Sequence, residues 1–514
     1  MESNIGFTLA RTSRRYEDKI AIVFKNRRMT YKQLNTRINR LANALLATGL
    51  RKGDKIALVF NNSNEFVESI YAAFKIGAVV IPINTRLTSQ EMHRLIDHSD
   101  ASFLMFDKSF LGKMEETLRQ NGKIEGIVIV GDEAEGDFLH YESLLEKGLP
   151  QEPKGIEVNE DDEACIIYTA GTTGKPKGVV LTHRNLLWTA VHYCISQLTT
   201  YDDVSLYVFP LYHIGAMGTY IAHALIGAEV HLKDRVDPED CLETIEREGI
   251  NRWSAVPTIY ANLCKLPQVH RYKLDSVSKL CSGAAPMTLD LKNRLIEIFP
   301  NAGIFDSYGQ TESAGAITIL SPKEALQKSG SVGLPYPTYE IRIVNDQDED
   351  VPPGEVGELL YDGYTRMNGY YKDPETTQEV MRGGWMHSGD LVKADEDGFI
   401  YIVDRKKDMI ITGGENVYSR EVEDIIIKIP QVAEVAVIGL PNSKWGEVVT
   451  AIVVPTSEEH LLESEIIEFC KNHIASYKCP KKVIFTKSLP KNAVGKILKN
   501  EVKRLFTESK KEVE

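Results

Sequence analysis

The sequence lacks the features of a secreted, zinc-binding or membrane-spanning protein. Its seven cysteines are scattered, odd in number and form no C-x-x-C pair, which argues against a disulfide framework and against a zinc site. The most apolar stretch, residues 66–84, is interrupted by Glu68 and Lys75 and is too short for a spanning helix. An apolar signal segment and a carboxyl-terminal Ser-Lys-Leu address are also missing. We therefore expect no membrane span, a reducing compartment and a cytoplasmic location.

An excess of positive charge is missing as well. The formal net charge is −13, which argues against nonspecific nucleic-acid binding and requires any site for a phosphate-bearing ligand to be locally basic. With 514 residues, the chain exceeds the size at which a single hydrophobic core stops growing, so at least two domains are expected.

The stretch YTAGTTGKPKG, residues 168–178, has the composition of a phosphate-binding loop. Its glycines allow close backbone approach to an anion, while threonine hydroxyls and two lysines supply hydrogen bonds and charge. Apolar, β-branched runs flank it at 165–168 and 179–183, which places the loop between two strands. The Walker spacing is absent because Pro176 follows Lys175, so a P-loop NTPase is disfavoured. A flexible surface turn is the alternative that the loop's composition alone leaves open.

The order of apolar runs predicts an α/β protein with a change of character near residue 330. Thr30 precedes a helical pattern that ends at Gly49, and strands alternate with helices from there to about residue 283. Short strands between Gly/Pro turns after 330 indicate a small antiparallel unit, and the region beyond Asp408 is typical of a separate α+β domain.

Seven motifs follow one another along the chain, and together they resemble the adenylate-forming superfamily, in particular its acyl-CoA synthetase branch. They are YTAGTTGKPKG (168–178), PLYHIGA (210–216), SGAAP (282–286), DSYGQTE (306–312), MHSGD (386–390), VDRKKDMIITGGENVYS (403–419) and NAVGKILK (492–499). A single short motif is weak support, but the complete ordered set is specific.

This resemblance implies an N-terminal part of two Rossmann-like α/β subdomains plus a small β-barrel, followed by a mobile α+β domain. The corresponding expected ranges are 1–404, divided at about 165 and 330, a hinge at 405–407, and 408–514. It also implies ATP, Mg²⁺ and coenzyme A as partners of a small carboxylic acid: the acid is adenylated with release of pyrophosphate, and its acyl group then moves to the CoA thiol. No nucleic-acid partner is expected, while a homodimer and a peripheral lipid contact are left open.

Positioned cations matter most in this chemistry, because two anions have to approach one another. Lys496 matches the lysine that bridges the carboxylate and the α-phosphate, and Glu312 matches the magnesium-binding acid. Without the motif context, Lys496 would be interpreted as a solvated surface lysine and Glu312 as a carboxylate at a helix start. Asp390 matches the residue that accepts hydrogen bonds from both ribose hydroxyls, with Arg405 assisting.

Further positions follow from the same resemblance. Tyr308 matches the adenine platform, although a core tyrosine is the alternative interpretation. Thr311 and Thr169 or Thr172 are expected to hold phosphate oxygens, and Thr169 is counted among the catalytic residues. The full set expected at the nucleotide is Thr169, Gly171, Thr172, Thr173, Gly174, Lys175, Lys177, Gly283, Ala284, Asp306, Ser307, Tyr308, Gly309, Thr311, Asp390, Arg405 and Lys496.

His213 matches an acyl-site wall position that gates the CoA thiol, although a lone histidine there is also typical of packing. Gly413, Gly414 and Glu415 match the loop that lines the CoA tunnel after the small domain rotates about Lys407. An ordinary turn is the alternative for that loop.

Three rival classes share these motifs: a ligase that loads a carrier protein, a luciferase-type oxygenase and a binding protein without activity. The segments TGGENVYSREVE and YKCPK resemble those of CoA ligases more than those of ligases that load a carrier protein. The presence of Lys496 and Glu312 disfavours a binding protein without activity. The segments matched to the acyl pocket are small and aromatic and carry no lysine or arginine, which favours a fatty or aryl monocarboxylate over a dicarboxylate. A medium- to long-chain fatty acid is the first choice, and a benzoate- or coumarate-type acid the alternative.

Overall fold

The computed structural model describes residues 4–120, 122–131, 138–169, 176–285, 287–442, 444–456, 461–491 and 497–508. The described residues form two compact units. The first unit is drawn from Met1–Gly171, Lys175–Glu340 and Asp362–Gly384, and the second from Thr172–Gly174, Ile341–Tyr361 and Trp385–Glu514.

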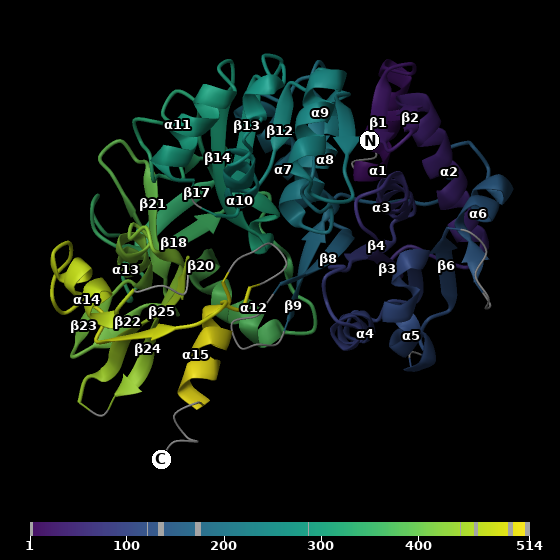
Figure 1. Cartoon of the computed structure of the whole chain (residues 1–514). Coiled ribbons are helices and arrows are strands. Elements are labelled where there is room, and N and C mark those ends of the chain that lie inside the picture. The colour runs from purple at the N-terminus through teal and green to yellow at the C-terminus, as the bar shows by residue number, and fades with distance from the viewer. Residues whose placement is uncertain are drawn as a thin grey trace. The chain divides into compact units, whose positions relative to one another are not determined.

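The first unit contains two mixed sheets (Figure 1). The eight-stranded sheet has, in spatial order, β19 (Gly369–Tyr370), β9 (Lys177–Thr182), β8 (Glu163–Thr169), β4 (Val79–Pro82), β3 (Lys55–Val59), β5 (Phe103–Asp107), β6 (Gly126–Val130) and β7 (Leu139–His140). The nine-stranded sheet has β16 (Leu334–Pro335), β15 (Gly315–Leu320), β14 (Gly303–Gln310), β13 (Lys279–Gly283), β12 (Arg252–Ser254), β10 (Val204–Tyr207), β11 (Glu229–Leu232), β1 (Ile20–Phe24) and β2 (Arg27–Thr30).

Both sheets are parallel in their central parts and antiparallel toward one or both edges. Strands β3 to β8 pair in parallel, whereas β8 with β9 and β9 with β19 are antiparallel. In the other sheet, β10 to β14 pair in parallel and β14, β15 and β16 are antiparallel. Because parallel strands end at the same edge, the loops after β13 and β14 lie together.

Helices pack on both sheets, and α1 contacts helices that accompany each of the two sheets. The helices of the first unit are α1 (Ile5–Arg15), α2 (Tyr31–Ala47), α3 (Asn64–Ile76), α4 (Ser89–His98), α5 (Leu111–Gln120), α6 (Tyr141–Lys147), α7 (His183–Ser196), α8 (Ile214–Ile226), α9 (Pro238–Glu248), α10 (Pro257–Leu263), α11 (Leu289–Ile298) and α12 (Pro374–Val380). Short 3₁₀ turns are η1 (Lys108–Phe110), η2 (Val269–Arg271), η3 (Thr311–Ser313) and η4 (Arg382–Gly384). Helix α1 packs against α2 and α3 on one side and against α7 and α8 on the other.

Helix α2 shows how the sequence specifies a boundary. The Thr30 side chain accepts a hydrogen bond from the Gln33 backbone, and the Gln33 side chain accepts one from the Thr30 backbone. This capping box satisfies two backbone donors that would otherwise lack partners at the helix start. The apolar face of the helix, including Leu34, Ile38 and Leu41, is fully buried, which confirms the helix predicted from Thr30 onward.

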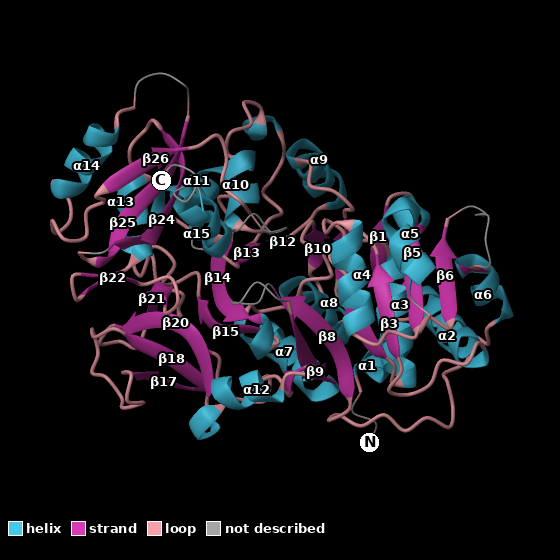
Figure 2. Ribbon diagram, turned by 90° about the horizontal axis from the view of Figure 1, so that it is seen from below, coloured by secondary structure: helices cyan, strands magenta, loops and turns pink. Residues whose placement is uncertain are grey.

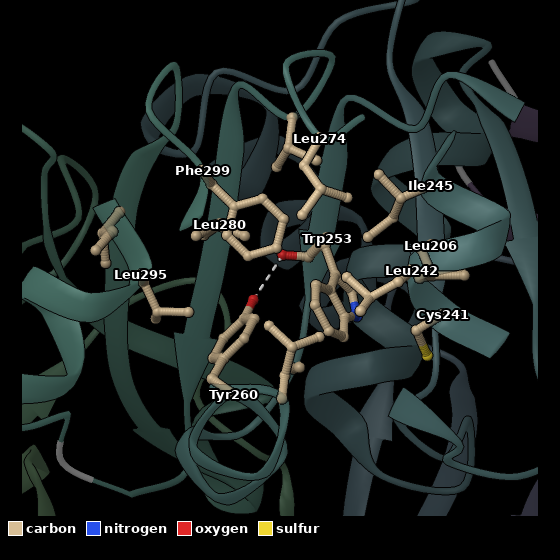
Figure 3. Close-up of a cluster of buried hydrophobic side chains, with 14 of the residues drawn as sticks. Leu206, Cys241, Leu242, Ile245, Trp253, Tyr260, Leu274, Leu280, Leu295 and Phe299 are labelled. Atoms are coloured by element: carbon tan, nitrogen blue, oxygen red, sulfur yellow. Dashed lines mark hydrogen bonds between the residues drawn. The ribbon is translucent and has the colours of Figure 1, made fainter. Parts of the chain in front are cut away.

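A large apolar cluster is formed by strands of the nine-stranded sheet and by helices α9, α10 and α11 (Figure 3). The cluster contains Leu242 and Ile245 of α9 and Leu295 of α11, together with Trp253, which is fully buried in β12. The hydroxyl of Tyr260, on α10, donates to the backbone oxygen of Trp253 at 2.9 Å, as Figure 3 shows. This cluster supports the strand ends that carry the SGAAP and DSYGQTE motifs.

The second unit contains two smaller sheets. An antiparallel sheet has the order β17 (Glu340–Val344), β18 (Gly357–Asp362), β20 (Met386–Ala394) and β21 (Ile400–Arg405). The other has the order β23 (Glu415–Val417), β22 (Ile410–Thr412), β25 (Gly446–Pro455) and β24 (Val432–Asn442), with β26 (Lys482–Phe485) beside β25. Its helices are α13 (Ser419–Ile426), α14 (Glu463–Lys471) and α15 (Lys499–Glu508).

Three details depart from the sequence-based expectations. Strands β1 and β2 join the nine-stranded sheet, while β8 and β9 belong to the eight-stranded sheet, so residue 165 does not separate the two sheets. The described strands β17, β18, β20 and β21 form an antiparallel sheet where a small barrel was expected. Residues of this sheet belong to the same compact unit as the C-terminal domain, whereas the sequence predicted them to belong to the N-terminal part. The hinge at 405–407 remains a prediction.

None of the described helices is both long and apolar enough to cross a membrane.

Removing the Tyr260 hydroxyl tests how the apolar cluster around Trp253 is stabilised. It lies 2.9 Å from the Trp253 carbonyl oxygen and 3.1 Å from that of Cys281, in a fully buried position. Tyr260→Phe should lower the free energy of unfolding by about 1–2 kcal/mol because buried acceptors lose their donor. Urea denaturation measures this, with Tyr272→Phe as the control, since that hydroxyl contacts Glu239 at the exposed surface. Equal midpoints for both variants would contradict the assignment.

Candidate active site

The glycine-rich loop connects two antiparallel strands, as predicted. Thr169 at the end of β8 pairs with Lys177 at the start of β9, and Figure 2 shows the two strands side by side. Both side chains are half-buried. The remaining predicted loop residues, Gly171, Thr172, Thr173, Gly174 and Lys175, lie outside the described residues.

The SGAAP and DSYGQTE motifs lie next to each other at the ends of β13 and β14. Gly283 is directly opposite Ser307 in the parallel pair. A side-chain carbon at Gly283 would come within 3.0 Å of the Ser307 backbone oxygen, so the close strand approach favours glycine. Ala284 follows with a φ of 66°, a left-handed conformation that turns the chain away from the strand. The structure thus brings together two motifs that are separated by 20 residues in sequence.

Asp306 is fixed by contacts inside the protein. Its carboxylate is buried beside the ammonium group of Lys292, 3.7 Å away, and accepts hydrogen bonds from the backbone N–H groups of Met287 and Ser307. Burial raises the pKa of Asp306 to about 6, and Lys292 opposes that rise. These bonds position the loop after Gly283, which is an indirect way for Asp306 to shape a nucleotide site. Direct contact with a nucleotide remains a prediction.

The end of β14 forms an irregular turn before Glu312. The strand register shifts between Tyr308 and Gly309, and a side-chain carbon at Gly309 would lie 1.9 Å from the Gly315 backbone oxygen. Only glycine fits that approach. Tyr308 is 9% exposed, so its ring belongs largely to the interior, and its predicted stacking on adenine remains untested. Thr311 begins η3, which carries Glu312.

Glu312 is held at both its backbone and its side chain. Its backbone oxygen accepts a hydrogen bond of 2.8 Å from the Met367 N–H, and the Tyr370 hydroxyl donates to its Oε1 atom at 2.8 Å. The ammonium group of Lys177 lies 4.9 Å from the centre of the Tyr370 ring. The predicted metal-binding acid and a predicted phosphate-binding lysine therefore contact the same tyrosine. Sequence reasoning missed Tyr370, and its place in GYYKDPE offers no clear signal.

A single carboxylate is a suitable protein ligand for Mg²⁺. Within the described ranges, no cluster of three or more His, Cys, Asp or Glu side chains is arranged to hold a metal ion. Mg²⁺ binds commonly through one or two carboxylates, with substrate phosphates and water completing its shell. Glu312, fixed by Tyr370 and located near the phosphate loop's strand, fits that mode.

His213 is an uncharged member of an aromatic wall. It precedes α8, its ring stacks on Phe209 at 5.4 Å and 13°, and the Tyr212 ring lies 4.8 Å away. Burial, followed by the charge of Arg86, lowers the pKa of His213 to about 4. Because it is neutral near pH 7, it can shape or gate a passage but cannot act there as a charged group.

In the second unit, Asp390 and Arg405 face each other across neighbouring strands. They are direct partners in the β20–β21 pair, and the Arg405 Nε atom lies 3.2 Å from the Asp390 Oδ1 atom. Asp390 is 4% exposed, so its carboxylate is largely shielded from water, and the guanidinium group of Arg405 is its ionic partner. The predicted ribose pair is therefore assembled, although contact with a ribose remains a prediction.

The predicted CoA loop is the tip of a tight hairpin between β22 and β23. Gly413 and Gly414 have φ values of 60° and 88°, and Thr412 pairs with Glu415. Positive φ at both central residues fits a two-residue turn. The side chain of Trp445, which is 46% exposed, has its ring beside Gly413. The Gly413 N–H also donates a hydrogen bond of 2.8 Å to the backbone oxygen of Trp445. Sequence reasoning did not identify Trp445.

The remaining predicted residues are Lys407 and Lys496. Lys407, the predicted hinge, is exposed after β21. Lys496 lies outside the described residues, between Lys491 and Ile497, which pair as an isolated antiparallel bridge.

Comparison with known proteins places the chain in a family. The AMP-binding enzyme model matches residues 9–371, and the AMP-binding enzyme C-terminal domain model matches residues 421–496. The chain therefore belongs to the AMP-binding enzyme family, and it is an AMP-forming acid–CoA ligase.

Similar proteins act on different acids. A feruloyl-CoA synthase of Amycolatopsis is 36% identical over 93% of this chain and 94% of its own length. The long-chain-fatty-acid–CoA ligase FadD13 of Mycobacterium tuberculosis is also 36% identical, over 93% of each chain. The structure of an O-succinylbenzoate CoA synthetase from Bacillus subtilis, in complex with ATP and magnesium ion, has a TM-score of 0.86 at 30% identity and covers 96% of this chain and 99% of that one.

The Lys292–Asp306 pair gives a prediction about stability. Lys292→Met should destabilise the fold by about 3–5 kcal/mol near pH 7, because Asp306 would keep a buried charge without its cation. Lys292 lowers the pKa of Asp306, so its removal should raise that pKa further, above the value of about 6 that Asp306 has beside Lys292. The stability penalty of the variant should therefore grow as the pH rises above about 6, where Asp306 ionises in the wild type, and shrink at lower pH, where Asp306 is protonated in both proteins. Denaturation at pH 5 and pH 7.5 measures the difference, and adding Asp306→Asn should restore most of the loss. An equal loss of unfolding free energy at both pH values would contradict the proposal that Asp306 is a buried charge in the variant.

Proposed function

We propose that the acid substrate is a monocarboxylic acid with an uncharged tail, and that a medium- to long-chain fatty acid is the first candidate. The supporting observation is the lack of lysine and arginine in the segments that the resemblance assigns to the acyl pocket, 209–220, 253–260, 281–286 and 307–315. His213, the one basic side chain there, is neutral near pH 7. A second carboxylate would therefore lose its hydration without gaining an ionic partner.

An aryl acid is a second candidate, favoured by aromatic side chains next to the small residues of α8 and β15. A side-chain carbon at Gly218 would come within 3.2 Å of the Tyr193 ring, and Gly315 also faces Tyr193. Nearby, His192 stacks on Tyr336 with 5.2 Å between ring centres, and burial lowers the pKa of His192 to about 4. An uncharged aromatic wall suits an aromatic tail as well as an aliphatic one.

The proposed reaction has two steps. In the first, a carboxylate oxygen attacks the α-phosphorus of ATP, and the bond to the pyrophosphate oxygen breaks. In the second, the CoA thiolate attacks the acyl carbonyl carbon and AMP leaves. We propose that Lys496 and the phosphate loop offset the charge in the first step and that Asp390 with Arg405 orients the ribose. Mg²⁺ bound at Glu312 would neutralise phosphate charge, and Gly413, Gly414 and Glu415 would line the CoA path after rotation about Lys407.

A substrate panel tests the proposal. Release of pyrophosphate and AMP is measured with ATP and Mg²⁺ for medium- and long-chain fatty acids, for benzoate, ferulate and indoleacetate, and for succinylbenzoate, each with and without CoA. We expect CoA-dependent turnover that is highest with a fatty acid and is weakest with the dicarboxylate. The highest turnover with an aryl acid would replace the first candidate by the second. Preference for succinylbenzoate would contradict the uncharged pocket, and adenylate formation without thioester formation would indicate a carrier protein as acceptor.

Lys496 gives a prediction for the two half-reactions. Lys496→Ala should reduce adenylate formation at least about a hundredfold, while thioester formation from supplied acyl adenylate stays near the wild-type rate, because only the first step needs that cation. Lys491→Ala is the matched control, since this lysine pairs with Glu434 close to the same loop. Equal loss of both half-reactions would remove the role assigned to Lys496.

A further inference from the structure

One short stretch of the first unit, residues 367–371, contacts both the metal-binding acid and the strand that leaves the phosphate loop. On one side, the Met367 N–H and the Tyr370 hydroxyl donate to the backbone oxygen and to the Oε1 atom of Glu312, each at 2.8 Å. On the other side, the stretch pairs with β9: Tyr370 is opposite Val179. The Tyr371 N–H donates to the Gly178 oxygen at 2.7 Å.

The stretch itself is held in place. The Tyr370 N–H donates to the Thr377 hydroxyl at 2.9 Å, and a side-chain carbon at Gly369 would lie 2.9 Å from the Thr377 methyl group. Thr377 is on α12, whose start is capped by the Asp373 side chain. Tyr370 therefore has a fixed backbone on an element that is paired to β9, and its ring can place a hydroxyl reproducibly.

The direction of the hydrogen bond to Glu312 is set by chemistry. The Tyr370 hydroxyl is the donor, and the carboxylate oxygen of Glu312 is the acceptor. A hydrogen bond to a charged acceptor is stronger than one between neutral groups and fixes the carboxylate's orientation.

The Tyr370 ring also contacts a predicted phosphate-binding cation, since the Lys177 ammonium group lies 4.9 Å from its centre. Lys177 is the first residue of β9, directly after the loop. One side chain thus contacts both a carboxylate suited to Mg²⁺ and a cation suited to phosphate.

We propose that Tyr370 is a positioning residue that holds the Glu312 carboxylate in register with the phosphate loop, so that ATP and Mg²⁺ are bound together. This inference rests on the proposed roles of Glu312 and Lys177. Tyr370 does not take part in bond making. Its effect is to orient an acid before the metal–nucleotide complex arrives, which saves that acid from reorienting during binding.

The test is direct binding of ATP by calorimetry, with Mg²⁺ and with EDTA, so that no acid substrate is needed. Tyr370→Phe keeps the ring and removes the hydroxyl. It should weaken ATP binding in Mg²⁺ by about tenfold or more and leave the affinity in EDTA nearly unchanged. Tyr371→Phe is the matched control, because this neighbouring hydroxyl bonds instead to Asp100 at 2.8 Å. The control should behave as the wild type in both solutions.

A double variant separates positioning from general damage to the fold. Glu312→Gln alone should lose the gain that Mg²⁺ gives to ATP binding, and adding Tyr370→Phe should then change nothing further. The inference would be overturned if the losses of ATP affinity in the two single variants added up in the double variant. It would also be overturned if Tyr371→Phe weakened ATP binding as much as Tyr370→Phe does, or if Mg²⁺ still increased the ATP affinity of Tyr370→Phe as much as that of the wild type. Absence of ATP binding by the wild-type protein would instead contradict the proposed nucleotide site.

Discussion

Repulsion between a carboxylate and a triphosphate is the constraint that this site has to overcome. Both reactants are anions, so bond formation depends on fixed cations and on a metal ion held at the right place. In the first unit, Tyr370 links the Glu312 carboxylate to the strand that leaves the phosphate loop, with Lys177 against its ring. In the second unit, the Asp390–Arg405 pair is already assembled. Each of these two contacts forms within its own unit from side chains of the chain itself, so the fold holds each of these side chains in one orientation.

Several motif residues have supporting contacts inside the protein, while their contact with a ligand remains a prediction. Asp306 is directed toward Lys292 and the backbone after Gly283, and Gly309 allows a strand approach that no other residue permits. His213 is a neutral ring between aromatic neighbours. Residues of a motif can thus maintain the shape of a site as well as supply its chemistry. The burial and the hydrogen-bond partners of each side chain indicate which supporting contacts it makes.

Much of the fold could be predicted from the sequence because it is locally encoded. Thr30 and the spacing of Leu34 and Ile38 specify α2, and the β-branched runs on either side of the glycine-rich loop specify β8 and β9. Non-local pairing could not be predicted in this way. The strand Ile20–Phe24 pairs with β11, some 200 residues away, and no local pattern records that choice. Likewise, Lys292 has the sequence character of an exposed helix lysine, yet it is fully buried because Asp306 lies opposite. Tyr370 was missed because its contact with Glu312 spans 58 residues.

The central claim is that the chain activates an acid as its adenylate before transferring it to CoA. The most direct measurement is mass spectrometry of the wild-type enzyme mixed with ATP, Mg²⁺ and the best acid of the panel, first without CoA and then after CoA is added. The account predicts about one equivalent of bound acyl adenylate, which CoA discharges to free acyl-CoA and AMP. Formation of ADP and phosphate, or of acyl-CoA without a detectable acyl adenylate in a rapid-quench experiment, would contradict it.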